Sequence, residues 1–135
     1  MDETKVRGSC LCGCVRYEVE GRIGDLSHCH CSMCRKAHGA AFGTYGKVAW
    51  EGFRITSGEH LVKTYRSSAD VSRTFCANCG AALQFIRDGK AGFGLAVGTL
   101  DSDCEARATA QIWTRDKAPW WDLERQPPAF DTYPP

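Results

Sequence analysis

The sequence has no long apolar run and no excess of charge of either sign. Its uninterrupted apolar stretches last a handful of residues, far short of the roughly 20 that a membrane-spanning helix needs. The formal net charge is +1, from 17 basic and 16 acidic residues, and the basic residues are dispersed. A nucleic-acid-binding surface is usually more basic and more clustered. We therefore expect neither a membrane span nor a nucleic-acid partner.

The start of the sequence also lacks the apolar segment of a secretory signal peptide, because residues 1–8 are the polar stretch MDETKVRG. The cysteine count is odd, at nine, which argues against a complete disulfide framework. Thiols stay reduced in the cytosol and remain free there to hold metal, so a cytoplasmic protein is expected. A length of 135 residues, 43% of them apolar, predicts a single domain, 1–135, with a hydrophobic core.

What the sequence has in quantity is cysteine, and seven of the nine lie in three short groups. These groups are Cys10-Leu-Cys12, Cys29-His-Cys31-Ser-Met-Cys34 and Cys76-Ala-Asn-Cys79. Thiolates at such spacings can converge on one zinc ion, whereas half-cystines one or two residues apart rarely reach disulfide geometry. Seven ligands complete one tetrahedral site and leave three for a second site with an open position. Closed zinc sites are typically structural, and open ones catalytic.

Two glycines indicate which cysteines share an ion. Gly13 follows Cys12 and Gly80 follows Cys79, so both pairs are predicted to form knuckles whose backbone amides turn toward the sulfur. The two knuckles together predict a closed structural site of Cys10, Cys12, Cys76 and Cys79. The open site then consists of Cys29, Cys31 and Cys34.

Alternation of apolar and polar residues predicts a mainly β fold of short antiparallel strands. It appears at 15–20, 53–56, 71–75, 83–85 and 93–97. Glycines at or near the breaks are expected to form turns with positive φ, at Gly43, Gly46, Gly52, Gly58, Gly80, Gly89 and Gly98. Only Ser32–His38 is predicted to be helical, and its first turn would favour the Cys34 thiolate. Beyond Pro119 we expect an extended tail packed by Trp120, Trp121 and Phe130.

The cysteine groups form a specific signature that runs through most of the chain. It reads GSCLCG at 8–13, CHCSMCRK at 29–36 and FCANCG at 75–80, and it extends to Ile112 and to KAPW at 117–120. This signature resembles the glutathione-dependent formaldehyde-activating enzyme and centromere protein V family. The resemblance implies a zinc-bound β-tent fold. Family members often carry histidine just before the residue that matches Ile112, whereas this chain has Gln111.

The resemblance also implies a role for each of the two cysteine sets. A structural zinc would occupy the four-cysteine site, and a catalytic zinc would occupy the site of Cys29, Cys31 and Cys34. The activity it implies is the addition of a small thiol, glutathione, to a small aldehyde, formaldehyde. The product is S-(hydroxymethyl)glutathione, and the reaction is formally that of a carbon–sulfur lyase run in reverse.

A zinc ion with three thiolate ligands suits this chemistry. A free thiol has a pKa near 8.5, so only a few per cent is thiolate at neutral pH, and metal coordination removes that limit. The open position could bind the incoming sulfur, or it could bind the carbonyl oxygen as a Lewis acid. His30, or alternatively His28, is the candidate for carrying a proton to the new alkoxide, because imidazole titrates near neutrality.

Other interpretations of the cysteines stay open. The central three could form a second structural site, whose candidate fourth ligands are Cys14, His28, His30 and Cys104. The chain could also be a non-catalytic zinc module that binds protein or nucleic acid, or a redox or metal-buffering protein with labile thiolates. His38 is interpreted as a loop residue. Arg73 is interpreted as a solvated residue that could meet a substrate carboxylate.

Overall fold

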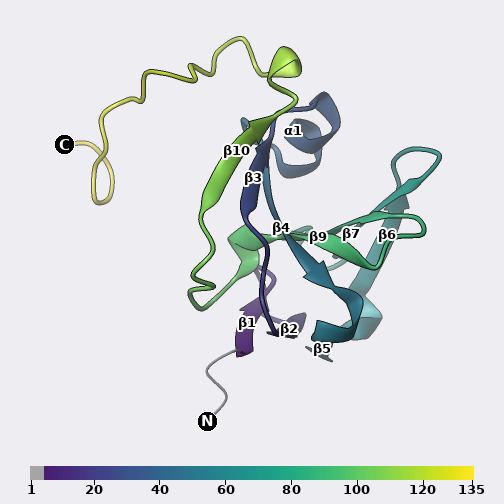
Figure 1. Cartoon of the computed structure of the whole chain (residues 1–135). Helices are drawn as coiled ribbons and strands as arrows, with labels where there is room; N and C mark the ends of the chain where they lie inside the picture. The colour runs from purple at the N-terminus through teal and green to yellow at the C-terminus, as the bar shows by residue number, and fades with distance from the viewer. Residues whose placement is uncertain (1–4) are drawn as a thin grey trace.

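The computed structural model describes residues 5–135, which form two β-sheets and one α-helix (Figure 1). The strands are β1 (Lys5–Ser9), β2 (Arg16–Glu20), β3 (Leu26–Cys29), β4 (Gly43–Ala49), β5 (Phe53–Ser57), β6 (Val62–Arg66), β7 (Val71–Cys76), β8 (Ala82–Arg87), β9 (Gly92–Ala96) and β10 (Ala108–Ile112). The helix α1 spans Ser32–His38, and short 3-10 helices cover Trp50–Gly52, Glu59–Leu61, Val97–Thr99 and Thr114–Asp116. The predictions of a mainly β fold and of this short helix are confirmed. None of the helices within residues 5–135 is long and apolar enough to cross a membrane.

The two sheets differ in size and pairing. The smaller sheet has the order β1-β2-β5 and is antiparallel. The larger has the order β10-β3-β4-β9-β8-β7-β6, and within it β10 runs parallel to β3 while the other pairs are antiparallel. Because β3 leads into α1 and β4 leads away from it, the helix lies at the ends of the second and third strands of the larger sheet.

The main hydrophobic core lies between the two sheets. Tyr17 and Val19 of β2 pack with Val48 of β4 and Leu95 of β9, and all four are almost completely buried. A second buried cluster consists of Cys10, Val15, Cys76 and Leu83. Two cysteines of the predicted four-cysteine site are therefore part of the packed interior.

The alternation pattern misses β1, β3, β4, β6 and β10, and four of the seven glycines expected to have positive φ lack it. Gly43 and Gly46 lie inside β4 without positive φ. A Cβ at Gly46 would lie 2.5 Å from Cγ2 of Ile23, and one at Gly43 would lie 2.8 Å from the ring of His38. These glycines let side chains approach the strand closely instead of forming turns. Gly52 and Gly98 also lack positive φ, whereas it is present, as predicted, at Gly58, Gly80 and Gly89.

The tail beyond Pro119 is extended, as predicted, but most of it is not packed. It leaves the body near the top of β10 and runs away from both sheets (Figure 1). Trp121 contacts Phe42 edge-on, with ring centroids 5.5 Å apart. Trp120 is 70% exposed and Phe130 is 53% exposed, so the expectation that these two rings pack the tail is wrong.

Candidate metal centres and the adjoining cavity

The first candidate centre joins two segments far apart in the sequence. This four-cysteine cluster consists of Cys10, Cys12, Cys76 and Cys79, whose sulfurs all lie within 4.8 Å of one another. Gly13 and Gly80 have φ of +79° and +80°, and their amides donate to the carbonyls of Cys10 and Cys76 over 3.0 and 2.7 Å. The two glycine turns are therefore nearly equivalent, and the glycine amides bond to carbonyl oxygens.

The sulfur separations in the four-cysteine cluster fit a tetrahedral zinc site. A Zn–S distance of about 2.3 Å places the sulfurs of a tetrahedron about 3.8 Å apart. Cys12 Sγ lies 3.6 Å from Cys10 Sγ and 3.9 Å from Cys76 Sγ. The amide of Val15 donates to Cys10 Sγ over 3.3 Å, and a hydrogen bond with the Asn78 side chain is the main cause that lowers the pKa of Cys12 to about 6. The second interaction favours the Cys12 thiolate, and thiolate is the form that binds metal.

The second candidate centre is the three-cysteine cluster, Cys29, Cys31 and Cys34, between the end of β3 and the first turn of α1. Cys31 is the N-cap of α1, and its Sγ accepts a hydrogen bond from the Cys34 amide over 3.3 Å. Gly39 ends the helix in the left-handed conformation, as predicted. The three sulfurs lie within 4.8 Å of one another, and no further Cys, His, Asp or Glu of residues 5–135 joins them. A metal held here would keep a coordination position open.

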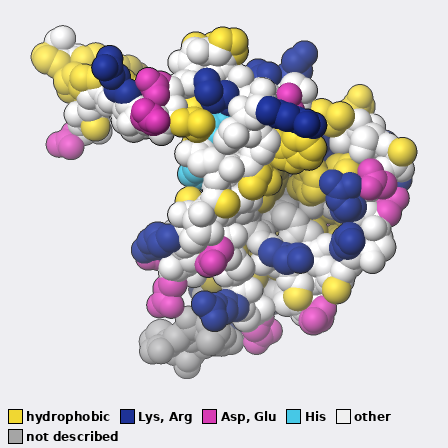
Figure 2. All heavy atoms as spheres, turned by 45° about the horizontal axis from the view of Figure 1, so that its top comes forward, with side chains coloured by type: hydrophobic (Ala, Val, Ile, Leu, Met, Phe, Trp, Pro, Cys, Tyr) yellow, Lys and Arg dark blue, Asp and Glu magenta, His cyan; other side chains and the backbone are white. Residues whose placement is uncertain are grey.

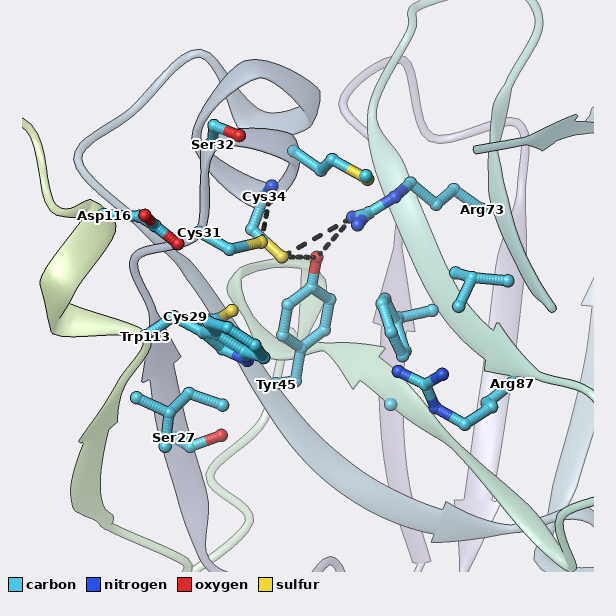
Figure 3. Close-up of a pocket in the computed structure, with 15 residues that line it drawn as sticks. Ser27, Cys29, Cys31, Ser32, Cys34, Tyr45, Arg73, Arg87, Trp113 and Asp116 are labelled. Carbon is cyan, nitrogen blue, oxygen red and sulfur yellow. Dashed lines mark hydrogen bonds between the residues drawn. The ribbon is translucent and has the colours of Figure 1, made fainter. Parts of the chain in front are cut away.

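Tyr45 of β4 and Arg73 of β7 converge on the Cys34 sulfur (Figure 3). The Tyr45 hydroxyl donates to Cys34 Sγ over 3.6 Å, and Arg73 Nη1 lies 3.6 Å from the same sulfur and 3.3 Å from the hydroxyl. A hydrogen bond with Cys29, helped by those from Tyr45 and Arg73, lowers the pKa of Cys34 to about 4 against the opposing effect of burial. The shared hydrogen bond raises the pKa of Cys29. The hydrogen bonds from Tyr45 and Arg73 therefore stabilise negative charge at the Cys34 sulfur.

Arg73 forms no ion pair with a carboxylate in the described part of the chain. Its Nε donates to Ser67 Oγ over 3.0 Å, and its guanidinium lies 5.0 Å from the centroid of the Phe85 ring. A partly buried cation needs compensating negative charge. Three thiolates around a divalent cation carry one net negative charge, which Arg73 would balance. The residues present therefore fit a zinc ion at the three-cysteine cluster.

The three-cysteine cluster opens onto a cavity of about 480 Å³, and no member of the four-cysteine cluster lines it. Apolar side chains form much of the wall, namely Met33, Val71, Phe85, Ile112 and Trp113. Arg73 and Arg87 lie across the cavity from Cys29 and Trp113 (Figure 3). In the space-filling view, hydrophobic side chains gather beside a hollow that Lys and Arg side chains border (Figure 2). The cavity offers an apolar space with cationic groups on one side, next to the cysteine sulfurs.

The structure places His30 away from this cavity. Its side chain is completely buried, its Nε2 lies 2.5 Å from Gln111 Oε1, and its ring packs against Phe42. His28 Nδ1 lies 2.9 Å from Thr44 Oγ1, and burial lowers the pKa of His28. The proton-carrying role of His30 stays a prediction, and the contacts seen here connect it to β10 rather than to the cavity. Among the described residues, none of the candidate fourth ligands joins the three-cysteine cluster.

Tyr45 is not indicated by any sequence pattern, and His38 is not the plain loop residue that was expected. His38 is the last residue of α1, and its Nε2 lies 2.8 Å from the Tyr45 hydroxyl. Burial raises the pKa of Tyr45, so this hydroxyl stays protonated and able to donate at neutral pH. Burial lowers the pKa of His38. The contact between His38 and Tyr45 depends on the register of β4 beside α1, and no local sequence motif reveals that register.

Fold and site together define a mainly β protein with two separate cysteine clusters that could bind metal ions. The family model described as glutathione-dependent formaldehyde-activating enzyme matches residues 5–116. The chain belongs to this family. The family resemblance found in the cysteine signature is therefore confirmed, while the β-tent arrangement stays a prediction.

Curated relatives include two proteins named as candidate glutathione-dependent formaldehyde-activating enzymes. One, from Phaeosphaeria nodorum, is 31% identical over 86 residues, which are 61% of this chain and 45% of the relative. The other, from Halomonas elongata, is 29% identical over 84 residues, which are 58% of this chain and 54% of the relative. The chain spans about half the length of these relatives. A crystal structure of a Rhodobacter sphaeroides protein has a TM-score of 0.62 at 24% identity and covers 76% of this chain and 99% of that one, a likeness in fold.

Proposed function

We propose that this protein catalyses the reversible addition of a small thiol, glutathione or a thiol like it, to formaldehyde. The observation that supports it most is the three-cysteine cluster, which opens onto the cavity of about 480 Å³. In the forward direction the thiol sulfur bonds to the aldehyde carbon, and the C=O π pair moves to the oxygen. The thiol proton ends on that oxygen, so the product is an S-hydroxymethyl thioether and no oxidant is needed.

We assign a zinc ion to each cluster, a structural one to the four cysteines and a catalytic one to Cys29, Cys31 and Cys34. Bound zinc at the three-cysteine cluster would supply a thiolate at neutral pH or polarise the aldehyde oxygen. Arg73 would balance the net negative charge of the zinc and its three thiolates, because its Nη1 lies 3.6 Å from Cys34 Sγ. The apolar wall around Phe85 and Trp113 offers few polar groups, which lowers the local dielectric constant and strengthens electrostatic contacts beside it.

Tyr45 is the residue that we assign as hydrogen-bond donor to the oxygen on which negative charge develops. Its hydroxyl lies within the site, 3.6 Å from Cys34 Sγ, and accepts from Arg73 Nη1 over 3.3 Å. The hydroxyl has one proton, which would turn from Cys34 Sγ to that oxygen while Arg73 holds the phenol oxygen in place. His38 fixes the hydroxyl from its other side.

The Tyr45→Phe variant is expected to lose about 10²-fold in kcat, because one fixed donor to a developing oxyanion contributes about that much. Phenylalanine keeps the ring that packs against Phe85, with centroids 5.6 Å apart, so circular dichroism should be unchanged. Tyr65→Phe is the matched control, because Tyr65 is an exposed tyrosine on β6. Equal kcat in the two variants would count against the role of Tyr45.

Exchange spectroscopy by NMR tests the activity itself. The rate of ¹³C magnetisation transfer between labelled formaldehyde hydrate and S-(hydroxymethyl)glutathione is measured with and without zinc-loaded protein. We expect a rate that rises in proportion to the protein concentration, above the uncatalysed rate. Repeating the measurement with cysteine and with 2-mercaptoethanol tells whether the cavity selects glutathione. No acceleration with any of these thiols would contradict the proposed activity and favour a non-catalytic zinc module or a metal buffer.

A further inference from the structure

Two parts of the described chain that lie on one side of the molecule have no cover. One is β10, which forms an edge of the larger sheet and whose five residues are all exposed. The other is the C-terminal arm, defined here as residues 122–135, all of them exposed. The arm, drawn in yellow, runs off on the side where β10 has its unpaired edge (Figure 1). Hydrophobic side chains gather at the far end of the projecting segment, and charged side chains lie between them and the body (Figure 2).

The open edge of β10 lacks the charged residues that usually protect an edge strand from pairing. Its sequence, Ala-Thr-Ala-Gln-Ile, has no charge and no proline. The opposite edge of the same sheet, β6, carries Lys63 and Arg66. An uncharged edge can pair with an identical strand without repulsion between like charges. The β10 edge is therefore available to pair with another strand.

The arm follows a short segment, residues 117–121, that is fixed to the body of the protein. Trp121 packs on Phe42, and Lys117 Nζ donates to the Trp121 carbonyl over 2.9 Å. Ala118, between them, is completely buried. The outward course of the arm therefore begins from an anchored segment.

The composition of the arm suits docking in an extended form. Four of the five prolines in the chain lie in it, and prolines favour a stiff, extended backbone that loses less entropy on binding. Phe130 and Tyr133 are 53% and 91% exposed, so both rings are free to pack on another surface. Fourteen residues can span up to about 46–50 Å when fully extended, enough to cross a neighbouring molecule.

We propose that a second copy of this chain covers this face, so that the protein is a two-fold symmetric dimer. The two β10 edges would pair, and each arm would pack on the other copy. In a two-fold arrangement each copy contributes the same surfaces to the interface, so β10 and the arm would both be covered. The arm and β10, with Trp113 and Trp120 between them, offer about 20 residues per copy, which is the size of a standard protein interface.

The dimer would also shape the mouth of the cavity. Trp113 and Asp116 line the cavity and lie in the segment between β10 and the arm. A second copy seated on this segment would narrow the opening beside the three-cysteine cluster.

Sedimentation velocity on the zinc-loaded full chain tests the dimer. The chain mass is 14.9 kDa, and we expect a species of twice that mass whose population falls on dilution. Thr109→Lys on β10 and Tyr133→Ser on the arm should each raise the dimer dissociation constant at least about 10-fold, since each places a change in the proposed interface. Their matched controls are Thr64→Lys and Tyr65→Ser on β6, which should leave the dimer dissociation constant unchanged.

The outcome is unambiguous if the circular dichroism of all four variants matches that of the parent chain. A monomer at every concentration up to about 200 µM, a range in which specific dimers assemble, would overturn the proposal. So would a dimer that Thr109→Lys and Tyr133→Ser leave intact, or one that the β6 controls weaken equally.

Discussion

Replacing Cys79 with alanine is expected to unfold the protein at 25 °C. The four-cysteine cluster connects the end of β1 to the turn between β7 and β8, and it adjoins a buried cluster that contains Cys10 and Cys76. Structural zinc sites contribute about 10–16 kcal/mol of binding free energy, which becomes folding free energy. A typical domain is stable by only about 5–15 kcal/mol, so losing one of four ligands removes a large part of the total.

Circular dichroism and thermal denaturation measure this effect. The Cys79→Ala chain should show no cooperative transition, or a Tm lowered by at least about 20 °C. Leu11→Ala is the control, because Leu11 lies between Cys10 and Cys12 in the sequence and its side chain is 86% exposed. That control should change the free energy of unfolding by no more than about 0.5 kcal/mol. A Cys79→Ala chain as stable as the control would contradict a structural zinc site.

Replacing Cys34 with alanine should give the opposite result, a folded and inactive protein. Cys34 presents its sulfur to the cavity, and its pKa is lowered to about 4 by Cys29, Tyr45 and Arg73. Removing a ligand of an open site leaves the metal too weakly held for chemistry, and the exchange rate should fall to the uncatalysed value, a loss of about 10³-fold or more. The thermal transition should stay cooperative.

Cys34 is almost completely buried, so its truncation could also disturb the packing of α1. Cys31→Ser separates the two effects. Serine is a favoured N-cap and keeps an acceptor for the Cys34 amide, but its hydroxyl does not replace a thiolate as a zinc ligand. We expect this variant to keep the helix and to lose the activity as Cys34→Ala does. Unfolding of both variants to the extent seen with Cys79→Ala would indicate two structural sites.

The helix could be predicted to the residue because its signals are local. Ser32–His38 lies between an N-cap and Gly39, which closes the last turn with φ of +60°. The cysteine clusters could be predicted for a similar reason. Ligands one to three residues apart are already near one another, and Gly13 and Gly80 mark the knuckles that orient them.

The missed strands and the missed site residues depend on contacts between distant segments. Gly46 lies in the middle of a strand because Ile23 and Leu26 occupy the space next to it, which the local sequence does not show. Tyr45 reaches the Cys34 sulfur because the strand pairing places it beside the helix, opposite Ser27 of β3. The exposed tail was mispredicted because its aromatic rings suggest burial, and the sequence gives no sign that the body offers them no surface.

The central claim is that the two metal centres differ. Four protein sulfurs close one centre, whereas the other has three protein sulfurs and an open coordination position. X-ray absorption at the zinc edge, combined with metal analysis, tests it most directly. In the resting parent chain we predict two zinc ions per chain and an average shell of about 3.5 sulfurs at 2.3 Å with a light atom completing the second site. In the folded Cys31→Ser variant, any zinc that remains should have a shell of four sulfurs. An average of four sulfurs in the resting parent chain, or a single zinc per chain, would contradict the account.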